Sequence, residues 1–352
     1  MTLARRGLVL IPISFVLIIQ GCIDTERNGI DEAAIRRVWH NLLLKYPEPA
    51  GSKRLGLLSS YPRMINSIHP HQFREPVNLL ISREGFMYVS DIMDNAIVVL
   101  DEDGNYAGKL GRYGQGPGEF CEPTYLSEGP AGDIFIFDSK NARIQSITRA
   151  GAQLSSFRVF KPCLSMAVDK EGELYLGLYD KDPKAPLLTV FDKFGKRLRD
   201  IGTKIGSGDP AFNDIDIAIT GDVINVVWKT YPLLRRYKCS GELLAEVRFD
   251  HGPLVIFGNK NISAKRVGQT IILRRIIWKM RSFSGRCYIL ITYPKLKILE
   301  FDQTGNIENA YWADTPFNYL AYDFAIAGEN ERKRIYVLQG NPDQNIAVFD
   351  VK

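Results

Sequence analysis

The chain is poor in the residues that most often build metal and catalytic sites. Its 352 residues include four histidines and five cysteines, and the cysteines form no CxxC pair or other metal-binding spacing. A histidine-based zinc site needs several ligands from the folded domain, yet only His251 lies within the repeats described below. No Gly-x-Ser-x-Gly, His-Glu-x-x-His or phosphate-loop motif is present. These absences make an enzyme the less favoured interpretation.

Strong charge is lacking as well. The formal net charge is +5, a mild excess that argues against nucleic acid as a partner. With 45% hydrophobic and 24% charged residues, the composition is that of a soluble globular protein with a sizeable core. Apart from Cys22, the cysteines lie far apart, at Cys121, Cys163, Cys239 and Cys287. We expect buried free thiols, although export would permit disulfides.

Only one long apolar run stands out, Gly7–Ile19, and it is 13 residues long. A membrane-spanning helix needs about 20 apolar residues, whereas a shorter run after Arg5 and Arg6 is typical of a secretory signal. Ile19–Cys22 resembles the lipobox of a bacterial lipoprotein, whose cysteine becomes the lipidated new N-terminus. We therefore expect a signal peptide at 1–21, a lipid on Cys22 as the membrane contact, and a location in the bacterial cell envelope. An uncleaved N-terminal anchor is the alternative.

Residues 22–52 are expected to connect the lipid to the folded domain. Asp31–Tyr46 has apolar residues three and four apart, acids first and Lys45 late, which predicts a short amphipathic helix. We expect this helix to pack on the side or mouth of the domain. Docking to a partner or lying on a membrane are its alternatives. A Pro- and Gly-containing linker ends this region at residue 52.

Short β-type runs separated by glycine-containing turns recur through residues 53–352. The glycines that close one such turn are spaced 47, 44, 46 and 64 residues apart, and they are Gly104, Gly151, Gly195, Gly241 and Gly305. A repeat of four strands with a period of about 40–50 residues is typical of propeller blades. The sequence therefore predicts an all-β fold, a six-bladed β-propeller of four-stranded antiparallel blades. The predicted blades are 73–118, 119–160, 161–205, 206–250, 251–312 and 313–352.

The chain ends after what would be the third strand of the last blade. A strand from about Leu55–Ile68 could supply the missing fourth strand by pairing with Asn345–Val351. Such closure removes the exposed sheet edges of an open array. We therefore expect an N-terminal strand to close the last blade.

One repeat carries a family resemblance. Gly111–Phe120 (GRYGQGPGEF), followed by Pro123, Gly132–Asp138 and Asn141–Gln145, resembles an NHL repeat of a six-bladed β-propeller, and residues 76–118 are a second copy. The resemblance implies the fold but no activity, because one fold hosts many activities.

Two groups of residues are candidates for particular roles. The candidate ligand-binding residues, which have no obvious core role, are Arg74, Arg112, Tyr113, Gln115 and Glu119. A solvated loop without a ligand is the alternative for them. The candidate structural turn residues are Asp91, Asn95, Asp138, Asn141 and Arg143. An Asp after a strand caps its own turn, and Arg143 is expected to bracket its turn and pack between blades.

The fifth repeat carries an insertion, His251–Arg286, in which cations alternate with apolar and aromatic residues. One interpretation is a cationic lip that binds an anionic glycan, a peptide carboxylate or a lipid headgroup. The favoured interpretation is two blade strands with solvated outward charges and buried inward apolar residues.

These observations favour a lipid-anchored scaffold that binds a protein, peptide or glycan ligand, as a monomer and without a cofactor. The alternative is a metal-dependent lyase or lactonase that holds Ca²⁺ through channel carboxylates. Candidate carboxylates for such an ion are Asp91, Asp138, Asp180 and Asp216. A third possibility is an envelope-complex subunit that docks through the helix at 31–46.

Overall fold

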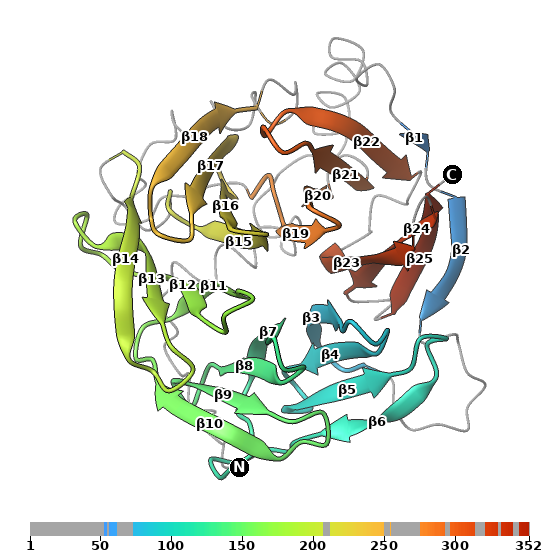
Figure 1. The fold of residues 1–352 in the computed structure, drawn as a ribbon. Helices are drawn as coiled ribbons and strands as arrows, with labels where there is room; N and C mark the ends of the chain where they lie inside the picture. The colour runs from blue at the N-terminus through green and yellow to red at the C-terminus, as the bar shows by residue number, and fades with distance from the viewer. Residues whose placement is uncertain are drawn as a thin grey trace, which may run out of the picture.

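The protein is a closed ring of six β-sheets (Figure 1). The computed structural model describes residues 53–54, 56–61, 73–206, 212–249, 254, 275–292, 296–313, 321–329, 332–340 and 345–351. The first strand of each sheet lies nearest the axis, and the first strands of neighbouring sheets contact each other all the way round. The predicted six-bladed propeller is thus confirmed. The predicted signal peptide, Cys22 and the helix at 31–46 lie outside the described residues.

The first three blades each contain four antiparallel strands in sequence order from the axis outwards. Blade 1 consists of β3 (Pro76–Ile81), β4 (Met87–Asp91), β5 (Ala96–Leu100) and β6 (Tyr106–Leu110). Blade 2 consists of β7 (Pro123–Glu128), β8 (Ile134–Asp138), β9 (Arg143–Ile147) and β10 (Gln153–Arg158). Blade 3 consists of β11 (Cys163–Val168), β12 (Leu174–Leu178), β13 (Pro186–Phe191) and β14 (Arg197–Thr203).

The other three blades follow the same plan, and an N-terminal strand is added at the outer edge of blade 5 and of blade 6. Blade 4 consists of β15 (Ile215–Thr220), β16 (Val223–Trp228), β17 (Leu233–Lys238) and β18 (Leu243–Arg248). Blade 5 consists of β19 (Lys279–Phe283), β20 (Arg286–Ile291), β21 (Leu296–Phe301) and β22 (Ile307–Ala313). Blade 6 contains β23 (Ala321–Glu329), β24 (Arg332–Gln339) and β25 (Ile346–Val351).

The N-terminal segment closes the ring. Strand β2 (Gly56–Tyr61) pairs antiparallel with β25, with Gly56 opposite Asp350, so the expected closing strand is confirmed. The sequence did not predict β1 (Lys53–Arg54), which pairs in parallel with β22 and extends blade 5 to five strands. Strand β1 therefore adds to blade 5, and strand β2, close behind it in sequence, adds to blade 6.

The glycine-ended turns recur in space as they do in sequence. All five closing glycines lie between the third and fourth strand of a blade and have positive φ, from 81° at Gly104 to 102° at Gly241. Such a backbone suits glycine because it lacks a Cβ. At Gly195 a Cβ would also come within 2.4 Å of the Phe157 ring in blade 2. These turns are therefore fixed by backbone conformation and by close packing between blades.

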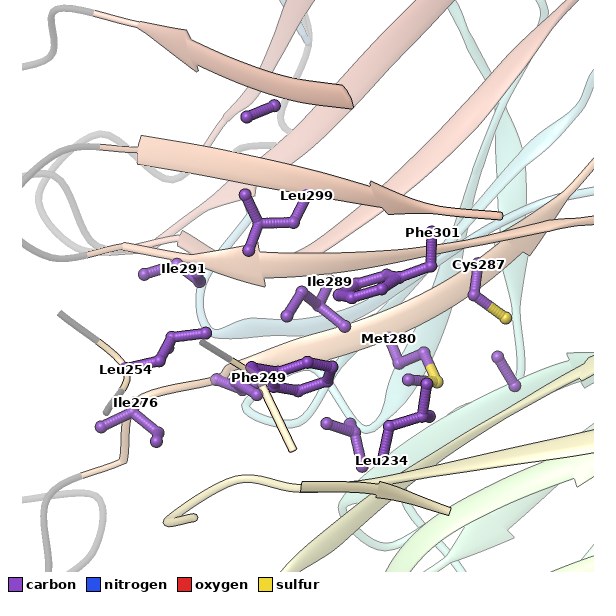
Figure 2. Packing of buried hydrophobic residues seen from close by; sticks show 14 residues of the cluster. Leu234, Phe249, Leu254, Ile276, Met280, Cys287, Ile289, Ile291, Leu299 and Phe301 are labelled. Carbon is purple, nitrogen blue, oxygen red and sulfur yellow. The ribbon is translucent and has the colours of Figure 1, made fainter. Parts of the chain in front are cut away.

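The hydrophobic core lies between the blades. Figure 2 shows the cluster between blades 4 and 5, where Leu234 lies near Met280 and the ring centroids of Phe249 and Phe301 are 5.1 Å apart. Strands β4 and β8 are buried along their whole length, whereas the outer strands β10 and β18 alternate between exposed and half-buried residues. Each buried Leu, Ile or Phe contributes about 1.5–3 kcal/mol. A single blade could not bury both of its faces without its neighbours.

Strand direction defines two faces of the ring. Because neighbouring strands of a blade are antiparallel, the start of the first strand, the turn between the second and third strands, and the connection to the next blade all lie on one face. We call this face the upper face. The opposite, lower face carries the turns that precede the second strand and the fourth strand.

Candidate functional site

A buried ion pair holds the glycine-rich loop Arg112–Phe120 on the upper face. Asp138, at the end of β8, is fully buried and accepts a hydrogen bond from Nε of Arg143 at 2.8 Å. The other guanidinium nitrogens of Arg143 donate to the backbone carbonyls of Gln115 (2.7 Å), Gly116 (3.0 Å) and Glu119 (2.9 Å). One arginine thus links a blade turn to the loop that precedes the same blade.

Several side chains of the loop are exposed, whereas that of Phe120 is fully buried in the core. Arg112 is highly exposed and pairs with Glu119 at 2.8 Å, and the backbone N–H of Gly116 also donates to Glu119. These hydrogen bonds, from Gly116 first and then from Arg112, lower the pKa of Glu119. Tyr113 is exposed, and its backbone forms a bridge with Phe120. Gln115 contributes its backbone carbonyl to the contact with Arg143.

Blade 1 has an equivalent turn on the same face. Asp91 accepts hydrogen bonds from the backbone N–H groups of Arg74 (2.6 Å), Glu75 (3.1 Å) and Asp94 (3.1 Å). Asn95 has a φ of 51° and accepts a hydrogen bond from the N–H of Glu122 at 2.9 Å. The Arg74 guanidinium lies 3.4 Å from Asp94. The structure therefore places Arg74 at the blade 1 turn, whereas Arg112 and Glu119 meet within their own loop.

Sequence reasoning missed a second feature, a ring of polar side chains on the innermost strands. Each blade contributes one residue, which lies opposite the next-to-last residue of the second strand of that blade. The six residues, which we call the polar ring, are Asn78, Tyr125, Ser165, Asp216, Lys279 and Asp323. All except the half-buried Tyr125 are buried.

Hydrogen bonds around the polar ring join neighbouring blades. At four of the six junctions, all formed by described residues, a polar-ring side chain accepts a bond from the backbone of the next blade. The donors and acceptors are Leu126 N–H to Asn78 (3.0 Å), Ile217 N–H to Ser165 (3.1 Å), Met280 N–H to Asp216 (2.7 Å) and Leu79 N–H to Asp323 (2.9 Å). Buried polar groups need such partners, so the ring helps to hold the blades together.

Further charges surround the polar ring in blades 4 to 6. Lys229 lies 3.0 Å from Asp214, and Arg275 donates to the same carboxylate at 2.8 Å. Arg281 forms an ion pair with Asp323. Burial alone would raise the pKa of Asp214, but Lys229 and then Arg275 hold this pKa below its ordinary value. The favoured interpretation of the basic insertion was therefore wrong for Arg275 and Arg281, whose charges pair with buried carboxylates near the axis.

Lys279 reaches across the axis. Its ammonium lies 4.6 Å from the ring centroid of Tyr125, and blades 5 and 2 are opposite each other in a ring of six. Burial lowers the pKa of Lys279 and opposes the influence of Asp216. Of the described residues, none places a carboxylate within ion-pairing distance of this ammonium. Lys279 is thus a buried cation whose direct contact is an aromatic ring.

The four proposed calcium ligands do not meet. Asp91 and Asp138 accept hydrogen bonds at their own turns, and Asp180 pairs with Lys161 near the surface. Asp216 lies at the axis, where Ser165 donates to it at 2.5 Å. Across the described ranges, no three His, Cys, Asp or Glu side chains are grouped as a metal would require. The one histidine predicted within the repeats, His251, lies outside those ranges.

One cavity lies away from the axis, between blades 2 and 3. It has a volume of about 290 Å³ and is lined by residues such as Phe160, Leu178 and Phe191, with Arg158 and Lys161 among its cations. Arg158 donates to the carbonyl of Asn141 at 2.7 Å, and Lys161 pairs with Asp180. The cations of this cavity are therefore already engaged.

The four described cysteines are free thiols. Cys163 and Cys287 are buried, and burial raises the pKa of each to about 12. Among the residues that the structure describes, no helix is long and apolar enough to cross a bilayer.

Comparison with known proteins agrees with this architecture. A family model described as a 6-bladed beta-propeller matches residues 72–146. The chain is a six-bladed β-propeller. No curated protein matches this propeller. That its repeats are of the NHL type stays a prediction.

Several solved structures resemble the propeller at low sequence identity. Virginiamycin B lyase from Staphylococcus aureus has a TM-score of 0.54 and 14% identity, with coverage of 87% of this chain and 97% of that one. A putative exported protein from Bacteroides fragilis has a TM-score of 0.54 and 14% identity, covering 84% and 94%. Regucalcin, a calcium-binding protein from Agrobacterium tumefaciens, has a TM-score of 0.50 and 10% identity, covering 85% and 95%. Such low identities show a shared fold and no shared activity.

The sequence held a partial signal for the polar ring. Asn78, Tyr125 and Ser165 each lie seven residues before a turn glycine of their blade, at Gly85, Gly132 and Gly172. In blades 4 and 5 the corresponding turns are shorter, which hides the repeat. A search for polar residues at a fixed distance from those glycines would have found three of the six.

Proposed function

We propose that this propeller is a lipid-anchored binding scaffold of the bacterial cell envelope, and that it recognises a protein or peptide with its upper face. The observation that carries the proposal is a set of exposed apolar side chains on that face. Met93 is 50%, Tyr113 73% and Phe160 82% exposed, and they lie on loops of blade 1, of the 1–2 connection and of the 2–3 connection. Exposed apolar groups on one face of a soluble domain are typical of interaction surfaces. Of the other six exposed large apolar side chains among the described residues, four lie on outer strands and two, Phe86 and Phe194, on lower-face turns.

Hydrogen bonds hold two of the loops that carry these side chains. Arg143 holds the loop that bears Tyr113, and Asp91 caps the turn that bears Met93. A preorganised loop loses little conformational entropy on binding, so more of the contact energy becomes affinity. The mixture of a methionine with two aromatic rings favours a peptide or protein surface over a glycan.

Site-specific photo-crosslinking tests this surface. A benzophenone amino acid replaces Tyr113 or Phe160 in the full chain expressed in its bacterial host. The matched control is Phe194, which is 69% exposed but lies on a lower-face turn. We expect one discrete crosslinked species from positions 113 and 160 and none from 194. Equal products from all three positions, or none from the upper-face positions, would refute the proposed surface.

The anchor is tested separately. Cells that express the chain are grown with an alkyne analogue of palmitate, and the protein is examined for label and for its membrane fraction. We expect label on the unaltered chain and its loss in Cys22→Ser, whereas Cys121→Ser should keep both label and location. A labelled Cys22→Ser variant would overturn lipidation at this cysteine.

A further inference from the structure

The charges at the axis do not balance. Three carboxylates, Asp214, Asp216 and Asp323, are faced by four cations. The four cations are Lys229, Arg275, Lys279 and Arg281. In the described part of the centre one positive charge is therefore left over.

The ion pairs among the described residues leave out Lys279. Lys229 and Arg275 both pair with Asp214, and Arg281 pairs with Asp323. Asp216 forms no ion pair with a described residue, and Lys279 is the cation that influences it most.

Lys279 forms no ion pair with a described residue, and its direct contact is the ring of Tyr125. Arg275 also lies over a ring, that of Trp278, but it is paired with Asp214. A buried charge without a partner is costly, and a cation on an aromatic face keeps its other sides available for an anion.

Three of the cations are the most exposed charges of this group. Asp216 and Asp323 are 0% exposed, and Lys229 and Asp214 are 3% and 4% exposed. Lys279 keeps 7%, and the side chains of Arg275 and Arg281 keep 19% and 23% of their surface. Arg275 also has an Nε donor without an acceptor, and a buried donor left unsatisfied costs about 1–3 kcal/mol. A solute that arrives at this point meets positive charge and hydrogen-bond donors.

We propose that the axis of the ring at Lys279 is a binding site for a single organic carboxylate, with Lys279 as its counter-ion. One negative charge neutralises the surplus, whereas a phosphate would bring a second charge into a centre that already holds three buried carboxylates. The ligand approaches from the upper face, because Lys279 begins its inner strand there. The site extends the proposed function by naming a ligand class, and it does not depend on the exposed side chains of Met93, Tyr113 and Phe160.

The test measures thermal stabilisation and calorimetric binding of the full chain with two pairs of probes. The first pair is trialanine and trialanine amide, and the second is galacturonate and its methyl ester. Within each pair the probes differ in the free carboxylate. We expect the acid of at least one pair to bind and its neutral partner to bind at least about tenfold more weakly. Binding of the peptide acid alone identifies a peptide C-terminus, and binding of galacturonate alone identifies an acidic sugar.

Variants assign the effect to Lys279. Lys279→Met removes the charge and keeps the side-chain length, and we expect it to abolish the preference for the acid. The matched control is Lys333→Met, because Lys333 also lies over a tyrosine ring, that of Tyr288 at 5.6 Å, but is paired with Glu300. This control should bind as the unaltered chain does.

Three results would overturn the proposal. They are equal binding of acid and neutral probes, no binding of either acid at millimolar concentration, and an intact acid preference in Lys279→Met. The first two use the unaltered chain and so do not depend on a variant that folds. The acid and neutral probes test Lys279, whereas the crosslinking experiment tests the positions of Tyr113 and Phe160. Either experiment can therefore fail without deciding the outcome of the other.

Discussion

Replacing Arg143 by methionine tests whether the buried ion pair organises the upper face. The change removes the 2.8 Å bond to Asp138 and three bonds to carbonyls of the loop. Asp138 keeps the N–H of Cys121 at 2.7 Å and the amide of Asn141 at 2.8 Å, but its charge loses its counter-ion. Breaking a buried ion pair from one side costs about 3–5 kcal/mol. We expect Arg143→Met to lose about this much stability.

The matched control is Arg112→Met, a change at the other arginine that contacts the same loop. Arg112 pairs with Glu119 in solvent, and exposed pairs contribute little. Urea unfolding followed by tryptophan fluorescence should leave the midpoint of this variant unchanged. At about 2–3 °C per kcal/mol, Arg143→Met should melt about 6–15 °C below the unaltered chain.

A double-mutant cycle separates the ion pair from the carbonyl contacts. In Arg143→Met with Asp138→Asn, no buried charge remains uncompensated, so the double variant should be more stable than the sum of the single losses predicts, by about 1–3 kcal/mol. Additive losses would show that the Asp138–Arg143 pair has no special role. An Arg143→Met variant as stable as Arg112→Met would refute the argument.

Three further predictions concern pH, thiols and metal. Burial alone would raise the pKa of Asp216, but its cationic neighbours, Lys279 first, lower it below its ordinary 3.8. The contribution of Asp216 to stability is therefore present above this ordinary value and is lost as the pH falls through the lowered value. In melting curves from pH 7 to 2, the decline below about pH 4 should be less steep for Asp216→Asn than for the unaltered chain. Because burial raises the pKa of Cys163 and Cys287 to about 12, a maleimide at pH 8 should spare both in the native protein and label them in urea. Dialysis against EDTA should leave the melting temperature unchanged, and a decrease that Ca²⁺ reverses would favour the metal-dependent alternative.

The blades could be predicted from the sequence because the turn before the fourth strand of a blade requires glycine. A closing turn with positive φ selects glycine, so Gly104 and Gly241 mark equivalent positions even where the strands share no residues. The spacing of these glycines gave the period, and the missing last strand gave the closure by β2. Strand β1 has two residues and no pattern of its own, and it could not have been found in this way.

The site near the axis was harder to predict. The alternation of polar and apolar residues along a strand indicates which face of the sheet is buried, but it does not indicate which residues lie at the edge of the strand. In a blade, both faces of the inner strand pack on neighbouring blades, and the edge of the strand faces the axis. Lys279 and Arg281 in β19 therefore looked like solvated charges, although Lys279 is buried and Arg281 pairs with Asp323. The loop at Arg112 was easier to notice because its glycines are unusual in sequence, but its role in binding remains a prediction.

The stability of Lys279→Met distinguishes a ligand site from a purely structural charge. If Lys279 were the structural counter-ion of Asp216, its removal should cost about 3–5 kcal/mol, as expected for Arg281→Met, which breaks the ion pair with the buried Asp323. If Lys279 instead carries the surplus charge, its removal leaves three cations for three carboxylates and ends the burial of an unpaired ammonium. Without ligand we then expect Lys279→Met to melt at or above the temperature of the unaltered chain, and Arg281→Met well below it. Equal destabilisation of the two variants, measured by calorimetry at pH 7, would show that Lys279 is a structural charge. A stabilised Lys279→Met variant would instead fit a residue kept for binding, because the fold is often more stable without such a residue.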